Sequence, residues 1–162
     1  MSDNEIHVRL AQADDDAFIL SLVERFVEFD LPPWRSKRDC VNGIYRDIAR
    51  HLSEQPAGSF LFVAENDDGE LVGFLHLQKT LDFFTQHWNC HISDIAVPEG
   101  GDGKGIGRAM LAFTDSWAQQ HDCRLITLSA FPGNTRARAL YESCGFGADL
   151  IRMAKVTPPK HR

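Results

Sequence analysis

The stretch DGKGIGRAML, from Asp102 to Leu111, places glycine at every second position and then continues as an apolar helix pattern. Glycine costs about 0.8–1.0 kcal/mol per residue in a helix relative to alanine, so glycines at a helix start need a reason. The first amide groups of a helix lack partners within the helix and lie at the positive end of its dipole. Bare glycine backbone at this place lets an anion such as a phosphate approach those amides.

Spacing excludes the two most familiar phosphate-binding loops. A P-loop needs a Gly-Lys pair followed by Ser or Thr, but Lys104 is followed by Gly105. A dinucleotide fingerprint needs GxGxxG, but Arg108 occupies the third glycine position after Gly103 and Gly105. The stretch therefore indicates an anion site of another kind, with a flexible turn that binds nothing as the alternative.

Strands and helices alternate on both sides of this stretch. Apolar periodicity and turn residues predict strands at 5–12, 59–65, 71–80, 87–97, 124–130 and 148–156, with helices at 16–29, 36–52, 106–117 and 134–144. The order β-α-α-β-β-β-α-β-α-β predicts an α/β (α+β) fold with a mixed, mostly antiparallel central sheet flanked by helices. We expect one domain over residues 1–157 and a short disordered tail at 158–162.

Composition narrows the location and the partners. The chain has 162 residues and a formal net charge of −6, which argues against a nucleic-acid partner. The acidic start MSDNEIHVRLAQADDD is no signal peptide, and no apolar run is long enough for a membrane helix, so a cytoplasmic location is expected. The four cysteines lack CxxC spacing and are expected as reduced thiols. No metal site is predicted, because the candidate ligands lack zinc-ligand spacing; they are His87, Cys90, His91, His121 and Cys123.

Two blocks of sequence together resemble the GNAT superfamily of acetyl-CoA-dependent N-acetyltransferases. The family's loop pattern Gln/Arg-x-x-Gly-x-Gly/Ala falls on Asp102, Gly105 and Gly107. Its downstream pattern Asn-x-x-Ala-x-x-x-Tyr-x-x-x-Gly-Phe falls on the segment NTRARALYESCGF, from Asn134 to Phe146. One helix and one strand separate the blocks, as in the family, and the predicted element order matches the family fold over nearly the whole chain.

The resemblance implies acetyl-CoA as the acetyl donor and an amine of a small molecule or peptide as the acceptor, with no metal. The expected acetyl-CoA-binding residues are Ile95, Ala96, Val97, Gly103, Lys104, Gly105, Ile106, Gly107, Arg108, Asn134 and Tyr141. Asp102 departs from the family pattern, which has a basic or amide residue there. Because a carboxylate repels pyrophosphate, the sequence predicts that Asp102→Arg tightens acetyl-CoA binding. Homodimers are common in the family, so the resemblance implies a homodimer.

Acetyl transfer to an amine needs an acid for the leaving thiolate and a base for the ammonium proton. The resemblance assigns Tyr141 as the acid, although a core tyrosine would fit the same helix pattern. His91, Asp94 or a relayed water are the candidates for the base. In an unbroken strand His91 shares a face with Ser93, and Asp94 takes the other face, but a bulge would shift that register.

The acceptor is expected between the first two helices and the segment LDFFTQHW (residues 81–88). Aromatic and acidic side chains there could hold a cation; the candidates are Glu28, Trp34, Phe83, Phe84 and Trp88. A lid or core edge is the bland alternative for the same residues. Two other functions stay open, a non-catalytic acyl-CoA sensor and a plain nucleotide-phosphate binder.

Overall fold

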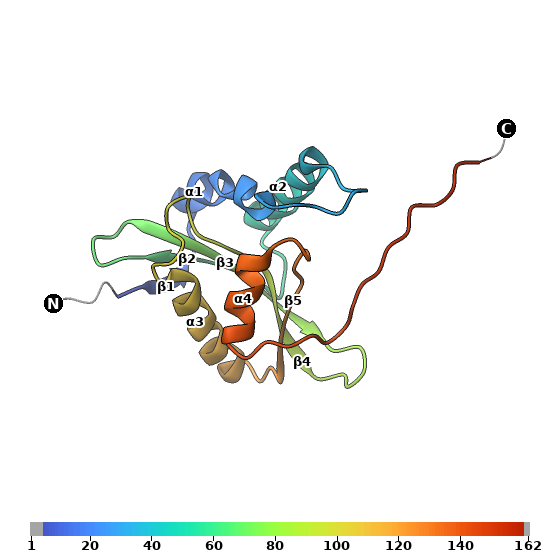
Figure 1. Cartoon of the computed structure of the whole chain (residues 1–162). Helices are drawn as coiled ribbons and strands as arrows, with labels where there is room; N and C mark the ends of the chain where they lie inside the picture. Colours follow the sequence, from blue (N-terminus) through green and yellow to red (C-terminus); the bar gives the residue numbers. More distant parts are fainter. Residues whose placement is uncertain (1–4, 161–162) are drawn as a thin grey trace.

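A five-stranded sheet runs through the middle of the computed structural model, which describes residues 5–160 (Figure 1). Its strands lie in chain order, and only the last pair, β4 with β5, is parallel. They are β1 (His7–Leu10), β2 (Ser59–Glu65), β3 (Leu71–Leu81), β4 (Trp88–Ala96) and β5 (Leu125–Leu128). The predicted mixed, mostly antiparallel sheet is confirmed.

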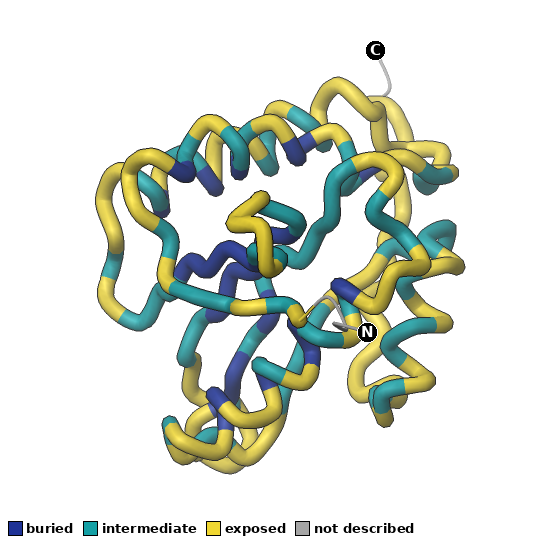
Figure 2. The backbone as a smooth tube through the Cα atoms, turned by 90° about the vertical axis from the view of Figure 1, so that its left-hand side faces the viewer, coloured by how far each residue is buried: buried dark blue, intermediate teal, exposed yellow. Residues whose placement is uncertain are grey.

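Helices cover both faces of this sheet. On one face lie α1 (Asp16–Ser21) and α2 (Lys37–Glu54), and on the other α3 (Ile106–Gln120) and α4 (Thr135–Ser143) (Figure 1). Each interface has its own apolar core: Ile19, Ile48 and Phe74 belong to the first, and Leu75 and Met110 to the second. Figure 2 shows the buried backbone concentrated in the central strands between these layers.

The predicted helix at 16–29 is divided in the structure. The short 3-10 segments η1 (Ala13–Asp15) and η2 (Val23–Val27) flank the six-residue α1. The predicted apolar face is nevertheless kept, because Ile19, Leu22 and Val23 are all buried. The tighter winding of η2 accompanies a contact to the sheet, since Arg25 donates a hydrogen bond to the carbonyl oxygen of Val97, just beyond β4.

One extra residue interrupts the pairing of β4 with β3. Leu77 pairs with Ile92 and His76 pairs with Asp94, so Ser93 is left as a bulge. The bulge puts His91, Asp94 and Ala96 on the side of α1 and α2, and Ile92 and Ile95 on the side of α3. The strand faces of the unbroken alternation are therefore wrong beyond Ile92, because the extra residue shifts the two-residue period.

The last predicted strand is not formed. Residues 147–160 carry no helix or strand, and every one of them is exposed. The apolar pattern at 148–156 is that of a strand, but a strand also needs a neighbour to pair with, and this segment has none in the described chain. Element order from β1 to α4 agrees with the sequence.

Two of the sequence predictions fall partly outside the described residues. These are the predicted absence of a signal peptide, at residues 1–4, and the last two residues of the predicted tail, 161–162. In the part that the structure describes, no helix is both long and apolar enough to cross a membrane.

Asp15 provides a stability test for the start of the first helical layer. Its carboxylate is buried, accepts two hydrogen bonds from the Arg9 guanidinium at 2.9 and 3.1 Å, and accepts a third from the Gln12 amide at 2.8 Å. The hydrogen bond from Arg9 holds the pKa of Asp15 below its usual value. We expect Asp15→Asn to lower the free energy of unfolding at neutral pH by about 2 kcal/mol, because a buried charge-assisted network loses its acceptor.

The pH dependence follows from the sign of this shift. A carboxyl with a lowered pKa stabilises the fold above its unfolded-state pKa of about 3.9, and this contribution fades as pH falls through the lower folded-state pKa. Urea unfolding of wild type and Asp15→Asn should therefore differ most at neutral pH and converge in acid. Asp14→Asn is the matched control, because Asp14 is exposed. An equal loss in both variants would contradict this role.

Candidate functional site

A cleft of about 900 Å³ opens where β4, α3 and α4 come together. Residues 95–97 form one wall, the glycine stretch and first turns of α3 form the floor, and α4 forms the opposite wall. Residues of η2 and the segment after it close a further side. The predicted binding residues that line the cleft are Ile95, Ala96, Val97, Gly103, Gly105, Ile106, Gly107, Arg108, Asn134 and Tyr141. Lys104 belongs to the same loop but is not among the lining residues.

The three glycines of the opening stretch serve two different needs. Gly103 and Gly105 both have φ of +79°, a left-handed conformation that favours glycine. A Cβ at either would meet nothing within 4 Å, so the space above this backbone is open. Gly107 is needed for packing, since its Cβ would lie 3.0 Å from the Leu140 side chain of α4. Gly105 is the N-cap of α3 and has no side chain to occupy the free amides of the first turn.

Asp102 is held by two arginines from distant parts of the chain. Its Oδ2 accepts a hydrogen bond from Arg25 Nη2 at 2.6 Å and forms an ion pair with Arg136 Nη1 at 3.2 Å. Arg25 is largely buried, pairs also with Glu28, and donates to the Val97 carbonyl at 3.0 Å. The carboxylate at position 102 is therefore neutralised locally, and Arg25 ties η2 to the end of β4 and the glycine loop.

Arg25 was missed by the sequence analysis. Within an amphipathic helix pattern, an arginine beside glutamates reads as an ordinary surface charge, and its partners lie 72 and 77 positions further along the chain. Asp102 is the local sign in the sequence that an arginine lies nearby, because a carboxylate in an anion-binding loop needs a cation to neutralise it.

Helix α4 supplies a cap and a phenol. The Asn134 side chain accepts a hydrogen bond from the Ala137 amide, which confirms the predicted N-cap. Tyr141 lies two turns into the helix and lines the cleft, and burial raises the pKa of its phenol above the usual value. Its proton is therefore retained through the neutral pH range.

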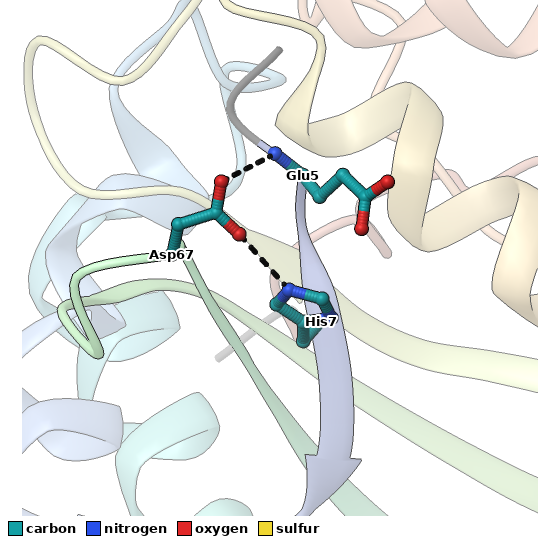
Figure 3. A group of neighbouring side chains, drawn as sticks. All are labelled: Glu5, His7 and Asp67. Carbon is teal, nitrogen blue, oxygen red and sulfur yellow. Dashed lines mark hydrogen bonds and ion pairs between the residues drawn. The ribbon is translucent and has the colours of Figure 1, made fainter. Parts of the chain in front are cut away.

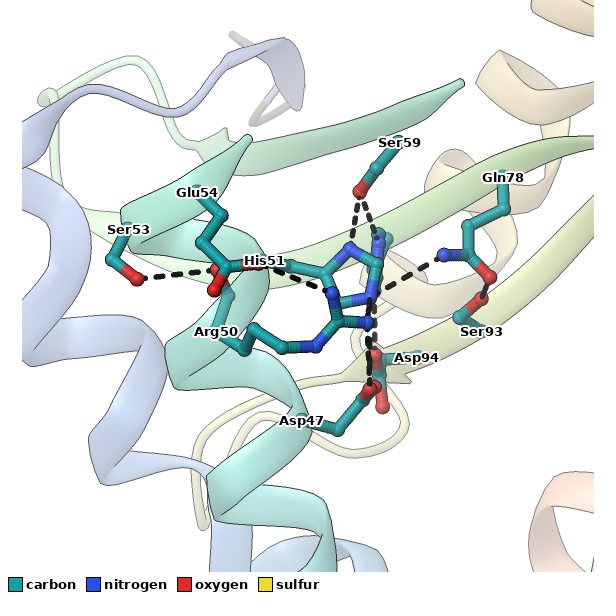
Figure 4. Close-up of polar contacts among 10 residues, drawn as sticks. Asp47, Arg50, His51, Ser53, Glu54, Ser59, Gln78, Ser93 and Asp94 are labelled. Atoms are coloured by element: carbon teal, nitrogen blue, oxygen red, sulfur yellow. Dashed lines mark hydrogen bonds and ion pairs between the residues drawn. The ribbon is translucent and has the colours of Figure 1, made fainter. Parts of the chain in front are cut away.

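A chain of short hydrogen bonds crosses the other face of the sheet (Figure 4). Asp94 Oδ2 lies 2.8 Å from His76 Nδ1, and His76 Nε2 lies 2.8 Å from Ser59 Oγ. The same hydroxyl lies 2.7 Å from Nδ1 of His51, on α2. His76 is fully buried, so the chain runs through the interior from β4 to the helix.

Elementary chemistry fixes the direction of these hydrogen bonds. At one end, an ionised Asp94 only accepts, so His76 donates to it from Nδ1. At the other end, the Arg50 guanidinium only donates, and its Nη2 lies 3.2 Å from His51 Nε2. His51 Nδ1 then donates to Ser59, and Ser59 donates to His76. Both histidines are neutral in this assignment, and burial lowers the pKa of His51 accordingly.

His91 and Asp94, the two residues that the sequence offers as the base, lie on the same face of the sheet but at different distances from the cleft. Asp94 is two residues before Ala96 of the cleft wall, which is about 7 Å along the strand. His91 is five residues before Ala96, about 16 Å away, and its Nδ1 lies 2.8 Å from Thr127 Oγ1. Burial lowers the pKa of His91, against the opposing charge of Asp94. Neither residue lines the cleft itself.

The residues predicted to bind the acceptor are divided between two places. Glu28 lines the cleft, and Trp34 lines a neighbouring hollow of about 320 Å³ between the start of α2 and Phe131. Phe83, Phe84 and Trp88 are exposed around the β3–β4 turn. Trp88 begins β4 and Ala96 ends it, so these aromatics lie about 26 Å along the strand from the cleft. The structure does not bring the two groups together.

One cluster of side chains in the described residues has metal-ligand chemistry, and it consists of Glu5, His7 and Asp67 (Figure 3). All three are exposed. Asp67 already accepts hydrogen bonds from the Glu5 amide at 3.3 Å and from His7 Nε2 at 3.1 Å. These hydrogen bonds connect the start of β1 to the β2–β3 turn, and we assign no metal to the cluster.

Comparisons with known proteins agree with this architecture. The model of the acetyltransferase (GNAT) family matches residues 21–146. An uncharacterized N-acetyltransferase of Bacillus subtilis, YhfO, is 27% identical over 144 residues, which are 89% of this chain and 91% of the relative. An aminoglycoside N(6′)-acetyltransferase of Stenotrophomonas maltophilia is 27% identical over 106 residues, covering 62% of this chain and 66% of its own.

Solved structures share the fold. An aminoglycoside N-acetyltransferase in complex with CoA superimposes with a TM-score of 0.69 at 16% identity, covering 96% of this chain and 97% of that one. At this identity the likeness concerns the fold alone.

Proposed function

Because the chain belongs to the acetyltransferase (GNAT) family, we propose that it moves an acetyl group from acetyl-CoA to a primary amine of a small molecule or peptide. The cleft carries this proposal. It joins a bare helix N-terminus, the end of β4 beyond its pairing with β5, and the partly buried phenol of Tyr141 in one space of about 900 Å³. Acyl transfer by direct attack of the amine needs a donor site, a path for the acceptor and an acid, and the cleft offers all three.

The cleft residues fit a CoA diphosphate. The open backbone at Gly103 and Gly105 exposes the first amides of α3. Arg108 and Arg136 also line the cleft, where Arg108 donates to Ser143 Oγ at 3.0 Å and Arg136 pairs with Asp102. The pantetheine arm would lie along Ile95, Ala96 and Val97. When bound, acetyl-CoA supplies the acetyl group as a thioester, whose carbon–sulfur bond breaks as the amine nitrogen bonds to the carbonyl carbon.

Tyr141 is proposed as the acid. Its raised pKa keeps the phenol protonated at neutral pH, so that its proton is there for the leaving thiolate. The ring of Tyr141 packs against the second core beside Phe146 and lines the cleft, which supports this role.

Asp94 is proposed as the base. An amine with a lysine-like pKa near 10.4 is almost entirely ammonium at pH 7, so its proton must be removed before attack. Of the two candidate bases on this face of β4, Asp94 is closer to the cleft wall, and its carboxylate is oriented by a hydrogen bond from His76. His91 is further away and already bonded to Thr127.

The hydrogen-bonded chain behind Asp94 holds the carboxylate in place as a proton acceptor. In the assigned direction His51 Nδ1 donates to Ser59, Ser59 donates to His76 Nε2, and His76 Nδ1 donates to Asp94. Because His76 Nδ1 already carries a proton, a proton received by Asp94 does not pass along the chain and is released from the carboxylate itself to solvent.

The acceptor is proposed to enter beside Glu28, next to the hollow lined by Trp34. A carboxylate and an aromatic ring are suited to a cationic amine. The aminoglycoside acetyltransferases among the relatives make polycationic amino sugars the first class to test. Phe83, Phe84 and Trp88 have no part in this proposal because of their distance from the cleft.

The function is tested by release of free thiol from acetyl-CoA across a panel of amines. Aminoglycosides, amino acids, polyamines and lysine peptides are compared, and the product is identified by mass spectrometry. We expect turnover with one class and an N-acetylated product. Tight acetyl-CoA binding without thiol release from any class would favour a sensor, and equal competition by ATP and CoA would favour a general phosphate binder.

Replacing Tyr141 tests the acid. We expect Tyr141→Phe to reduce kcat about 10- to 100-fold, because the thiolate loses its proton donor, while the ring keeps its packing. The Kd for acetyl-CoA, measured by calorimetry, should change less than about twofold. Turnover equal to wild type would remove Tyr141 from the mechanism.

The base and the chain that orients it are tested by three variants with one control. We expect Asp94→Asn to lower kcat about 100-fold, and Ser59→Ala to lower it about tenfold, because His76 loses the donor that keeps its Nδ1–H toward Asp94. Ser53→Ala is the control, because its exposed hydroxyl bonds only to the Arg50 carbonyl. If His91 were the base, kcat would fall as pH drops below about 6.5, the usual histidine pKa, because burial lowers the pKa of His91, and this acid limb of the pH profile would vanish in His91→Ala. We expect the acid limb of the wild-type profile to be unchanged in His91→Ala.

The ion pairs of Asp102 reverse the expectation from sequence. Asp102→Arg sets a third guanidinium against Arg25 and Arg136 and leaves the partly buried Arg25 with Glu28 as its carboxylate partner. We expect acetyl-CoA affinity to fall about tenfold at low salt, measured by calorimetry. Glu99→Arg carries the same charge change on an exposed loop position and should have little effect. Tighter binding in Asp102→Arg would restore the simple repulsion argument.

A further inference from the structure

Four charged side chains of the cleft form a row of alternating sign, which we call the ion-pair row. In order they are Glu28, Arg25, Asp102 and Arg136, and all four line the cleft. Arg25 Nη1 pairs with Glu28, and Arg25 Nη2 lies 2.6 Å from Asp102 Oδ2. The same oxygen lies 3.2 Å from Arg136 Nη1. The formal charges of the row therefore cancel, and each inner member divides its attraction between two partners.

The middle of the ion-pair row is held in place, while its ends are free to exchange partners. The Arg25 side chain is 18% exposed and also donates to the Val97 carbonyl at 3.0 Å. The end members Glu28 and Arg136 have side chains that are 40 and 73% exposed. An exposed ion pair is weak, so another charged group in reach can replace either partner.

The two ends of the row face the two substrates of the proposed reaction. Glu28 is the carboxylate beside which a cationic acceptor is proposed to enter. Arg136 lies in the first turn of α4 and, through Asp102, next to the glycine stretch that is proposed to hold the CoA diphosphate. A guanidinium binds phosphate strongly, but that of Arg136 is paired with a carboxylate while the row is intact.

Resting on the proposed function, we propose that the ion-pair row couples the two substrate sites, so that a cationic amine at Glu28 releases Arg136 to the phosphates of CoA. The ammonium takes over the Glu28 carboxylate, and Arg25 keeps Asp102 as its one carboxylate partner. Asp102 is then neutralised more fully by Arg25 and attracts Arg136 less. The added positive charge also repels the mobile Arg136 and attracts the anionic cofactor. By linkage, bound CoA raises the affinity for the amine by the same factor.

Glu28→Gln imitates the neutralised end of the row without any amine. We expect it to lower the Kd of CoA, measured by calorimetry at low salt, about three- to fivefold, because Arg136 is released. Glu24→Gln is the matched control, since Glu24 is exposed on the same segment η2 and forms no ion pair among residues 5–160. It changes the net charge equally and should leave the Kd within about 1.5-fold of wild type, because a distant exposed charge is screened.

Arg136 variants distinguish the row from a general effect of charge. Arg136→Gln should abolish the gain in affinity caused by Glu28→Gln, whereas Arg136→Lys should keep part of it because the positive charge remains. Both side chains are substantially exposed, so the circular dichroism spectrum should be unchanged in every variant.

Two results would overturn the ion-pair row and leave the proposed function intact. One is an equal Kd of CoA in Glu28→Gln and Glu24→Gln. The other is a gain in affinity that persists when Glu28→Gln is combined with Arg136→Gln. Failure of the wild-type chain to bind CoA would overturn the proposed function and the row together.

Discussion

One extra residue in β4 decides what each face of the sheet presents. Side chains of a strand alternate between the two faces of the sheet. Ile92 and Ile95 can both face α3 only because the extra residue Ser93 shifts this alternation by one position. Without the bulge, a strand that kept Ile92 under α3 would bring Asp94 into that core and turn Ile95 out of it. The bulge lets apolar residues continue under α3 while a carboxylate stays on the side of α2.

That carboxylate is tolerated in the interior because its neighbours are polar in the right order. A buried charge is costly unless it is hydrogen-bonded, and His76 supplies a donor at 2.8 Å from a fully buried position. The same ring needs a partner for its second nitrogen, which brings in Ser59, and Ser59 needs one in turn, which brings in His51. The polar chain thus follows from placing Asp94 next to the cleft, and it ends where α2 reaches solvent.

The parts of this molecule that could be predicted from sequence are those fixed by local patterns. Glycine spacing located the start of α3, and the asparagine and tyrosine pattern located α4 and its cap. The Ser59–His76–Asp94 chain could not be derived in that way, because its members lie on three strands and meet only through register. A histidine in the middle of the apolar strand LVGFLHLQKT was the one local sign that something polar is buried there. Arg25 likewise gains its role only from partners more than 70 positions away.

The direction of the polar chain restricts what protonation can do. If His51 took up a proton, its Nε2 would become a donor facing the Arg50 donor at 3.2 Å and the Gln78 amide at 3.5 Å. Burial is the main cause of the lowered pKa of His51, and the repulsion from the neighbouring Arg50 lowers it further. A proton taken up by Asp94 cannot move along the chain, because His76 Nδ1 already carries a proton and every donor in the chain points toward Asp94. The network therefore orients the carboxylate and does not carry its proton away.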